Sequence, residues 1–455
     1  MLNWFVAGRR LLTAASIVLV ALLLAGCGSD GEGSGAATGQ TSASTTTQTS
    51  EPVEGTLTFW SSLTATSERA WWNRLIKRFE RRYPGARVEF TTYSTEEYFT
   101  KLLAAFSSGD EPGVFVADAG EELDKFVRTG KVAPLNDMVD LSHFKPAAVK
   151  PLTGPGGEIH GIPLAWYILL LWENEDVLAE HGVASPRTWD ELLTACGTLS
   201  SEGVTPIALG DGGQDQWTAA HLLGTLLYQY GGAGIAANAT HGTDGASWTD
   251  PAFVDAAARL RQLIDADCFP KGFTGMNYAQ MSAQFLQQKA AMIFTGAWLT
   301  SEYESSGERF AIGTAPLPDG PDAVNSTEAL DGIVGGVFGL AATTKAVDDN
   351  PALVKAFLDE AGAAVDDFAN ANARLSVAVE PNPTGGPLQA QLTRMLNTVG
   401  ELAAVPDVTL PAAVLDDYYQ NVQALTAGEL SPEEFAQAME DASETERPNL
   451  PKPAE

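Results

Sequence analysis

Apolar residues recur with two alternating patterns between residues 56 and 129. Short apolar runs predict three strands, which end at Trp60, at Tyr93 and at Asp118. Apolar residues at helical spacing follow each run and predict a helix after each strand. Such regular alternation indicates a parallel α/β sheet, because each helix carries the chain back to the edge where the next strand starts.

A second alternating region follows Pro163. Residues 168–172 are an unbroken apolar run, which is typical of a strand buried on both faces of a parallel sheet. Thr188 and Glu191 can form a capping box, which predicts a helix that begins at residues 186–188. Residues 331–340 predict an extended return between two lobes, and the next helix, residues 351–361, is expected to pack on the first lobe. Three more helices are expected to follow.

A chain of 455 residues is too long for one hydrophobic core, so we expect two lobes. The return to the first lobe implies two or more hinge strands. The predicted fold class is α/β, with two lobes that are each a mostly parallel sheet flanked by helices. The expected N-terminal lobe comprises residues 55–163 and 336–376, and the expected C-terminal lobe comprises residues 164–335 and 377–455.

The first residues predict the compartment. Arg9 and Arg10 precede an apolar run, residues 11–25, that is shorter than the roughly 20 residues needed to cross a bilayer. We therefore interpret residues 1–26 as a signal peptide. Leu24-Ala25-Gly26-Cys27 resembles the lipobox of bacterial lipoproteins, in which the cysteine is acylated. Residues 27–54 would then be lipidated Cys27 and a flexible tether that holds the protein at the outer face of the bacterial cell membrane.

Two further cysteines remain after Cys27. Cys196 and Cys268 could form a disulfide outside the cell, or could be two small buried hydrophobic residues. Their positions in separate predicted helices favour the unpaired form.

Charge and motifs exclude several classes of function. A formal net charge of -31 without a basic cluster would repel nucleic acid, so we expect no nucleic-acid partner. A G-x-S-x-G elbow, a Walker loop, a C-x-x-C pair and an H-E-x-x-H helix are absent, and the five histidines lack metal-ligand spacing. We therefore predict no enzyme, no catalytic residue, no cofactor and no metal.

Aromatic and polar residues gather at predicted strand ends, where ligands of α/β sheets bind. Tryptophan and tyrosine stack on the C–H faces of sugar rings, while acid and amide groups hydrogen-bond the hydroxyls. The candidate ligand-binding residues are Trp60, Ser61, Ser62, Tyr93, Asp118, Glu121, Trp166, Tyr167, Gln214, Trp217, Trp298 and Asp331. Each aromatic residue could instead pack in the core, and the two acids could instead cap a helix. Of Trp166 and Tyr167, one is expected to pack and the other to face the ligand.

Several short motifs together resemble the extracellular solute-binding proteins of carbohydrate ABC transporters, the family that includes maltose-binding proteins. They are the turn His160-Gly161-Ile162-Pro163, the cap Thr188-Trp189-Asp190-Glu191-Leu192, and residues 285–292 followed by Thr295-Gly296-Ala297-Trp298. In the family, the matching tryptophan commonly faces the ligand. Gln288 stands where the family usually has glycine, so the turn there departs from the pattern. The resemblance runs from Thr56 to about Leu425 and implies a two-lobed periplasmic-binding-protein fold.

The expected function is capture of a sugar or oligosaccharide between the lobes by hinge closure, and its delivery to the transmembrane subunits of an ABC permease. A monomer is expected. Three alternatives remain open: a binding protein for a polyamine or another small solute, a surface glycan hydrolase, and a surface protein that binds only a protein partner. Stacked aromatic residues with amides would favour sugar, whereas several carboxylates around an aromatic box would favour a cation.

Overall fold

The computed structural model describes residues 52–154, 156–213, 215–327 and 332–450. Residues Ser50–Glu455 form one compact unit. Three predicted functional residues, Cys27, Gln214 and Asp331, lie outside the described residues.

The strands form one connected set in the order β2-β1-β3-β8-β4-β6-β5, in which β7 also pairs with β4 and β9 with β8. Their bounds are β1 Glu54–Ser61, β2 Gly85–Thr92, β3 Val114–Asp118, β4 Ile162–Asn174, β5 Thr205–Ala208, β6 Ala290–Gly296, β7 Ile312–Ala315, β8 Gly332–Ala342 and β9 Glu401–Ala404. Parallel pairing joins β1 to β2 and β3, and β5 to β6, as the alternation of strands and helices predicts.

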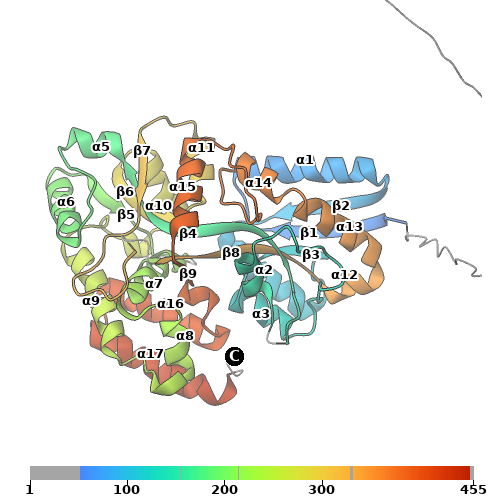
Figure 1. Cartoon of the computed structure of the whole chain (residues 1–455). Helices are drawn as coiled ribbons and strands as arrows, with labels where there is room; N and C mark the ends of the chain where they lie inside the picture. Colours follow the sequence, from blue (N-terminus) through green and yellow to red (C-terminus); the bar gives the residue numbers. More distant parts are fainter. Residues whose placement is uncertain (1–51, 155, 214, 328–331, 451–455) are drawn as a thin grey trace, which may run out of the picture. The chain divides into compact units, whose positions relative to one another are not determined.

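The helices lie between these strands and beyond the last of them (Figure 1). The α-helices are α1 Thr66–Arg82, α2 Thr95–Ser108, α3 Glu121–Val127, α4 Pro146–Val149, α5 Glu175–Glu180, α6 Trp189–Ser201, α7 Trp217–Gly231, α8 Ile235–His241, α9 Pro251–Asp265, α10 Tyr278–Leu286, α11 Leu299–Ser306, α12 Thr344–Asp349, α13 Pro351–Gly362, α14 Val365–Ala371, α15 Pro387–Thr398, α16 Ala412–Ala427 and α17 Pro432–Glu446. Short 3-10 turns are η1 Lys150–Leu152, η2 Thr243–Gly245, η3 Phe273–Gly275, η4 Pro406–Val408 and η5 Arg447–Asn449.

Strand β4 connects two parts of the sheet. Its first part, residues 162–168, pairs with β8, and its second part, residues 169–174, pairs with β6 on one side and β7 on the other. All thirteen of its residues are buried. The apolar run therefore lies in a strand buried on both faces, but the expected parallel pairing is wrong there, because all three neighbours run antiparallel to β4.

The first part of the sheet is covered by helices from both ends of the chain. Phe59 on β1 lies 4.7 Å from Trp72 of α1 and 5.5 Å from Phe357 of α13, measured between ring centroids. The predicted return of the helix after β8 to the first lobe is thus confirmed. Arg374, which follows α14, donates from Nε to Oε1 of Glu68 on α1 at 2.8 Å, and both side chains are buried.

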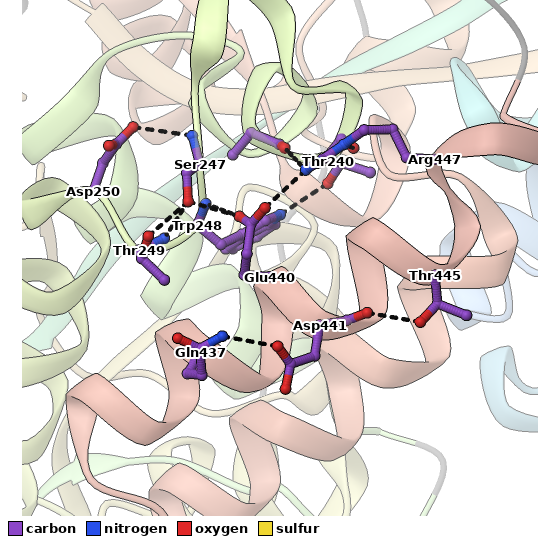
Figure 2. Close-up of polar contacts among 11 residues, drawn as sticks. Thr240, Ser247, Trp248, Thr249, Asp250, Gln437, Glu440, Asp441, Thr445 and Arg447 are labelled. Atoms are coloured by element: carbon purple, nitrogen blue, oxygen red, sulfur yellow. Dashed lines mark hydrogen bonds and ion pairs between the residues drawn. The ribbon is translucent and has the colours of Figure 1, made fainter.

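The last helix is tied to the middle of the chain by one carboxylate (Figure 2). Glu440 on α17 accepts from the Ser247 hydroxyl at 2.8 Å and from the backbone amide of Trp248 at 2.7 Å, and it pairs with Arg447 at 3.0 Å. Trp248 is fully buried. This network holds the connection before α9 against the C-terminal helix, so residues 240–250 and 440–447 form one structural unit.

Two local sequence signals are visible in the structure, one a departure from the family pattern and one a predicted cap. Gln288 has a φ of 60°, so it adopts the left-handed conformation that glycine would adopt more easily, and the turn before β6 is retained. The capping box at Thr188 and Glu191 forms as predicted and starts α6.

The preference for unpaired cysteines is wrong. Cys196 on α6 and Cys268 form a disulfide, with their Cα atoms 4.8 Å apart. Cys268 lies beyond the end of α9 rather than within a helix, and its carbonyl accepts from the amide of Ile207 on β5. This places it beside α6, which also packs on β5.

The disulfide closes a loop with a sequence separation of 72 residues. Loop-closure entropy predicts that its removal costs about 4 kcal/mol, and engineered cases commonly give less. We therefore expect Cys196→Ser with Cys268→Ser to lower the free energy of unfolding by about 2–4 kcal/mol, measured by denaturant titration. Equal stability of the variant, together with thiol labelling of both cysteines in the unreduced wild type, would contradict the pairing.

Candidate functional site

Five aromatic side chains meet at the end of β6. We call Tyr167, Trp217, His221, Tyr278 and Trp298 the aromatic cluster. The ring centroid of Trp298 lies 5.5 Å from that of Tyr167 and 5.7 Å from that of Trp217, and Trp217 lies 5.0 Å from Tyr278. Trp217, Tyr278 and Trp298 are only half-buried, so each has surface in contact with solvent. Residues from β4, α7, α10 and the β6–α11 connection are thereby brought to one place.

Gly296 explains how Trp298 reaches this position. A Cβ atom at residue 296 would lie 2.0 Å from a ring carbon of Trp298, so the indole can fold over the end of β6 only if residue 296 has no side chain. The Gly296-Ala297-Trp298 motif is therefore a steric requirement of the cluster.

Hydrogen bonds fix the orientation of the rings. The Trp298 Nε1 donates to the Tyr278 hydroxyl at 2.7 Å, and that hydroxyl donates to Glu302 Oε1 at 2.7 Å. Asp215 accepts from the Trp217 Nε1 at 3.0 Å and from the Tyr278 amide at 2.9 Å. These two carboxylates hold the cluster from behind, and they limit the freedom of its rings before any ligand arrives.

Tyr167 enters the cluster from β4 because β8 has two glycines opposite it. A Cβ at Gly335 would lie 2.2 Å from the Tyr167 carbonyl oxygen, and a Cβ at Gly336 would lie 2.4 Å from its hydroxyl. The Tyr167 ring also packs on Phe338, with centroids 4.9 Å apart. Trp166 is buried in the core and its amide donates to the Leu375 carbonyl. Tyr167 is buried as well, and the expectation that one of the pair packs while the other faces the ligand stays a prediction.

A carboxylate from the last quarter of the chain borders the cluster. Asp407 in η4 accepts from His221 Nε2 at 2.9 Å and from the Tyr419 hydroxyl at 3.3 Å. The same turn lies against the start of α3, because a Cβ at Gly120 would lie 2.3 Å from the Val408 carbonyl oxygen. Through η4, the end of β3 in the predicted first lobe is connected to the aromatic cluster in the predicted second lobe.

Acidic side chains of the two predicted lobes, Asp118 and Glu122 of the first and Asp407 of the second, lie near one another beside the cluster. Burial raises the pKa of Asp118 well above its ordinary value, and the charges of Glu122 and Asp407 raise it further, against smaller opposite effects of Lys125 and Arg374. Burial raises the pKa of Glu122 as well, although Lys125 pairs with it at 2.5 Å. Asp118 is half-buried at the end of β3. The site therefore holds more acid than base.

Five predicted residues lie outside the aromatic cluster. Trp60 and Tyr93 are half-buried and pack on each other, with centroids 5.1 Å apart. Ser61 is buried, and its hydroxyl accepts from the Leu63 amide at 3.0 Å, so it shapes the turn after β1, where Ser62 is partly exposed. Glu121 pairs with Arg128.

Reasoning from the sequence missed several residues of the site, above all Tyr278, His221, Glu302 and Asp407. Tyr278 directly follows the capping residue of α10, Asn277, and this capping box is a signal that could have placed it near a strand end. Asp407 has no comparable local signal, because only the tertiary contact of η4 with α3 and α7 brings it to the site. Among the described residues, no group of three or more His, Cys, Asp or Glu side chains is placed to hold a metal ion. The described helices include none that is long and apolar enough to span a membrane.

The long strands β4 and β8 join the two parts of the sheet, and the aromatic cluster lies beside this junction. This arrangement is that of a two-lobed binding-protein fold. A solved structure from work on xylan utilization by the thermophilic bacterium Caldanaerobius polysaccharolyticus is 25% identical, with a TM-score of 0.77, and the match covers 85% of this chain and 99% of that one. A solved chitin oligosaccharide binding protein is 24% identical, with a TM-score of 0.78 over 87% of this chain and 99% of that one. The predicted fold class is thus confirmed.

The family of bacterial extracellular solute-binding proteins matches residues 65–365, and the chain belongs to this family. An uncharacterized ABC transporter extracellular-binding protein from Pyrococcus horikoshii is 22% identical over 291 residues, which are 62% of this chain and 64% of that relative. The chain therefore spans less than two thirds of this curated relative. Membership confirms the family expected from the motifs, which consists of solute carriers rather than enzymes.

Glu302 predicts a specific dependence of stability on pH. Burial raises the pKa of Glu302 from 4.5 to about 7, so the folded protein keeps this proton at a pH where the unfolded chain has lost it. Stability must then fall as pH rises between these two values. We expect Glu302→Gln, which keeps an acceptor for Tyr278, to reduce this fall by on the order of 1–3 kcal/mol.

The measurement is the free energy of unfolding of both proteins from pH 4.5 to pH 7, the span between the two pKa values. Asp211, whose pKa burial likewise raises to about 7, leaves a residual slope in the variant. Parallel curves for wild type and variant would show that Glu302 is ionised in the folded state at neutral pH.

Proposed function

We propose that this protein captures a sugar or oligosaccharide between its two lobes as the binding component of an ABC importer. The observation that carries the proposal is the aromatic cluster, whose half-buried rings of Trp217, Tyr278 and Trp298 are held by hydrogen bonds to carboxylates. Flat rings in a fixed orientation suit the C–H faces of a pyranose. The names of the structural neighbours, which concern xylan utilization and chitin oligosaccharides, support the same ligand class.

Acidic groups around the rings would bind the hydroxyls. Asp118 and Asp407 come from opposite sides of the proposed cleft, so a ligand that donates one hydroxyl to each would hold the lobes together. An analogue without the hydroxyl that meets Asp118 would leave that side chain without its partner, at a cost of roughly 1–3 kcal/mol. The rim residues Trp60, Ser62, Tyr93 and Glu121 would extend the site toward further sugar units.

Hinge closure would couple binding to transport. We assign residues 55–163 and 336–376 to one moving lobe and residues 164–335 and 377–455 to the other, with β4 and β8 as the connecting strands. A ligand that contacts both lobes binds the closed form more tightly and shifts the population toward it. The transmembrane subunits of the permease would then recognise the closed form of a monomer anchored through lipidated Cys27. Gln214 and Asp331 remain candidate contacts of the ligand.

A second candidate is a cationic solute. The convergence of Asp118, Glu122 and Asp407 beside aromatic rings favours it, because carboxylates around an aromatic box attract a cation. Two of these acids already have partners, since Glu122 pairs with Lys125 and Asp407 with His221. We therefore place the sugar first.

A panel of mono- and oligosaccharides and of polyamines tests the ligand class by thermal shift. A ligand at 100 times its dissociation constant stabilises the folded state by about 2.7 kcal/mol. Stabilisation by a neutral carbohydrate is expected. A shift with polyamines alone would favour the cation, and cleavage products from a glycan would indicate a hydrolase.

Removal of one ring tests the site itself. We expect Trp298→Ala to weaken binding of the identified sugar roughly 30-fold, the factor that 2 kcal/mol represents for a central contact. Tyr83→Ala is the matched control, because Tyr83 is also half-buried but lies at the end of α1, where it packs on Phe79. The control should bind within twofold of wild type in calorimetric titration; equal losses in both variants would contradict the assignment.

A further inference from the structure

Helix α1 has a basic face in a strongly acidic protein, so the expectation that the chain has no basic cluster is wrong. Arg74, Lys77, Arg78, Arg81 and Arg82 follow one another at intervals that place them on one side of the helix, over two turns. All five are exposed, whereas Trp72, Leu75, Ile76 and Phe79 on the opposite side are buried. We call these five residues the α1 basic face.

Part of this charge has no partner in the described structure. Arg78 and Arg82 both pair with Glu360 on α13, at 2.6 and 3.0 Å. Arg74, Lys77 and Arg81 are in none of the ion pairs among the described residues. The formal net charge of the whole chain is -31, so an acidic protein keeps three unpaired cations side by side on one helix.

The basic face also borders a hollow. A cavity of about 290 Å³ is lined by Trp71, Arg74, Leu75, Lys77, Arg78, Arg81 and Asp367. Asp367 accepts from the Trp71 Nε1 at 2.8 Å, so its charge is partly engaged. Four basic side chains around a small hollow suit a phosphate group, which arginine binds through paired hydrogen bonds and lysine as a point charge.

The position of the basic face indicates what meets it. The C-terminal end of α1 leads directly into β2, whose first residue, Gly85, pairs with Glu54 at the start of β1. The chain thus enters the compact unit at the same edge where Arg81, Arg82 and the exposed Arg87 lie. If residues 27–54 tether the protein to a lipid on Cys27, the tether joins the compact unit at this edge.

We propose that the α1 basic face docks on the anionic phospholipid headgroups of the membrane to which the protein is anchored. The proposal rests on the lipid anchor of the proposed function, but not on the identity of the solute. Basic residues near an anionic surface each strengthen attachment, and one acyl chain alone gives only marginal, reversible binding. Screening within about 8 Å at physiological ionic strength lets this local patch act despite the negative charge elsewhere.

The test uses residues 50–455, the compact unit, without any acyl group, so that only the surface is measured. Cosedimentation with vesicles of phosphatidylcholine containing about one third phosphatidylglycerol is compared with vesicles of phosphatidylcholine alone. We expect binding only to the anionic vesicles, falling as salt is raised. R74E/K77E/R81E should bind at least tenfold less. If charge reversal disturbs folding, the neutral variant R74Q/K77Q/R81Q replaces it, and it should also lose binding to the anionic vesicles.

The matched control, K271E/K289E/R394E, makes the same change in net charge at three exposed positions outside α1. It should keep at least half of the wild-type binding. Equal loss in the control, equal binding to neutral vesicles, or binding of inorganic phosphate without binding of vesicles would each overturn the proposal. Solute binding measured on the same samples separates this result from a failure of the solute site.

Discussion

The antiparallel pairing of β4 with β8 is the constraint on which the rest of the structure depends. These two strands cross between the parts of the sheet, and every residue of β4 is buried. Their close approach needs glycine at residues 335 and 336, because a Cβ at either position would collide with Tyr167. The same contact that joins the two parts therefore sets the position of an aromatic ring of the site. In the proposed hinge closure, these strands would bend beside Tyr167.

The candidate site is acidic, whereas the exposed face of α1 is basic. The candidate site gathers Asp118, Glu122 and Asp407: burial raises the pKa of Asp118 and of Glu122, and the charge of Asp407 adds to both shifts. Glu302 supports the rings of the site from behind. The basic residues of α1 lie instead on the exposed side of the helix whose buried side covers β1 and β2. Helix α1 thus packs its apolar side in the core of the first sheet part and presents a positively charged side to solvent.

The sequence was informative where local physical rules act. Helical spacing, capping residues and apolar runs predicted the helices and most strands. Trp298 was predicted at the rim from its place after a strand and from the family resemblance, and the structure adds that Gly296 leaves room for its ring. Three failures have a common cause. The direction of β4, the Cys196–Cys268 disulfide and the place of Asp407 all depend on contacts between segments far apart in the chain, for which spacing along one segment carries no signal. Trp60 and Tyr93 were predicted correctly as strand-end residues, but they pack on each other rather than in the cluster.

The central claim, that one solute is held by both lobes at once, is tested most directly by hydrogen exchange with and without a bound oligosaccharide. The account predicts that the ligand slows exchange simultaneously in residues 118–122, which precede and begin α3, in residues 215–221 at the start of α7, and in residues 297–302 after β6. It predicts no change in the exchange rate of α9 and α17, which belong to the second lobe but not to the site. Slower exchange on only one side, or no difference in any of these segments while the sugar is bound, would contradict it.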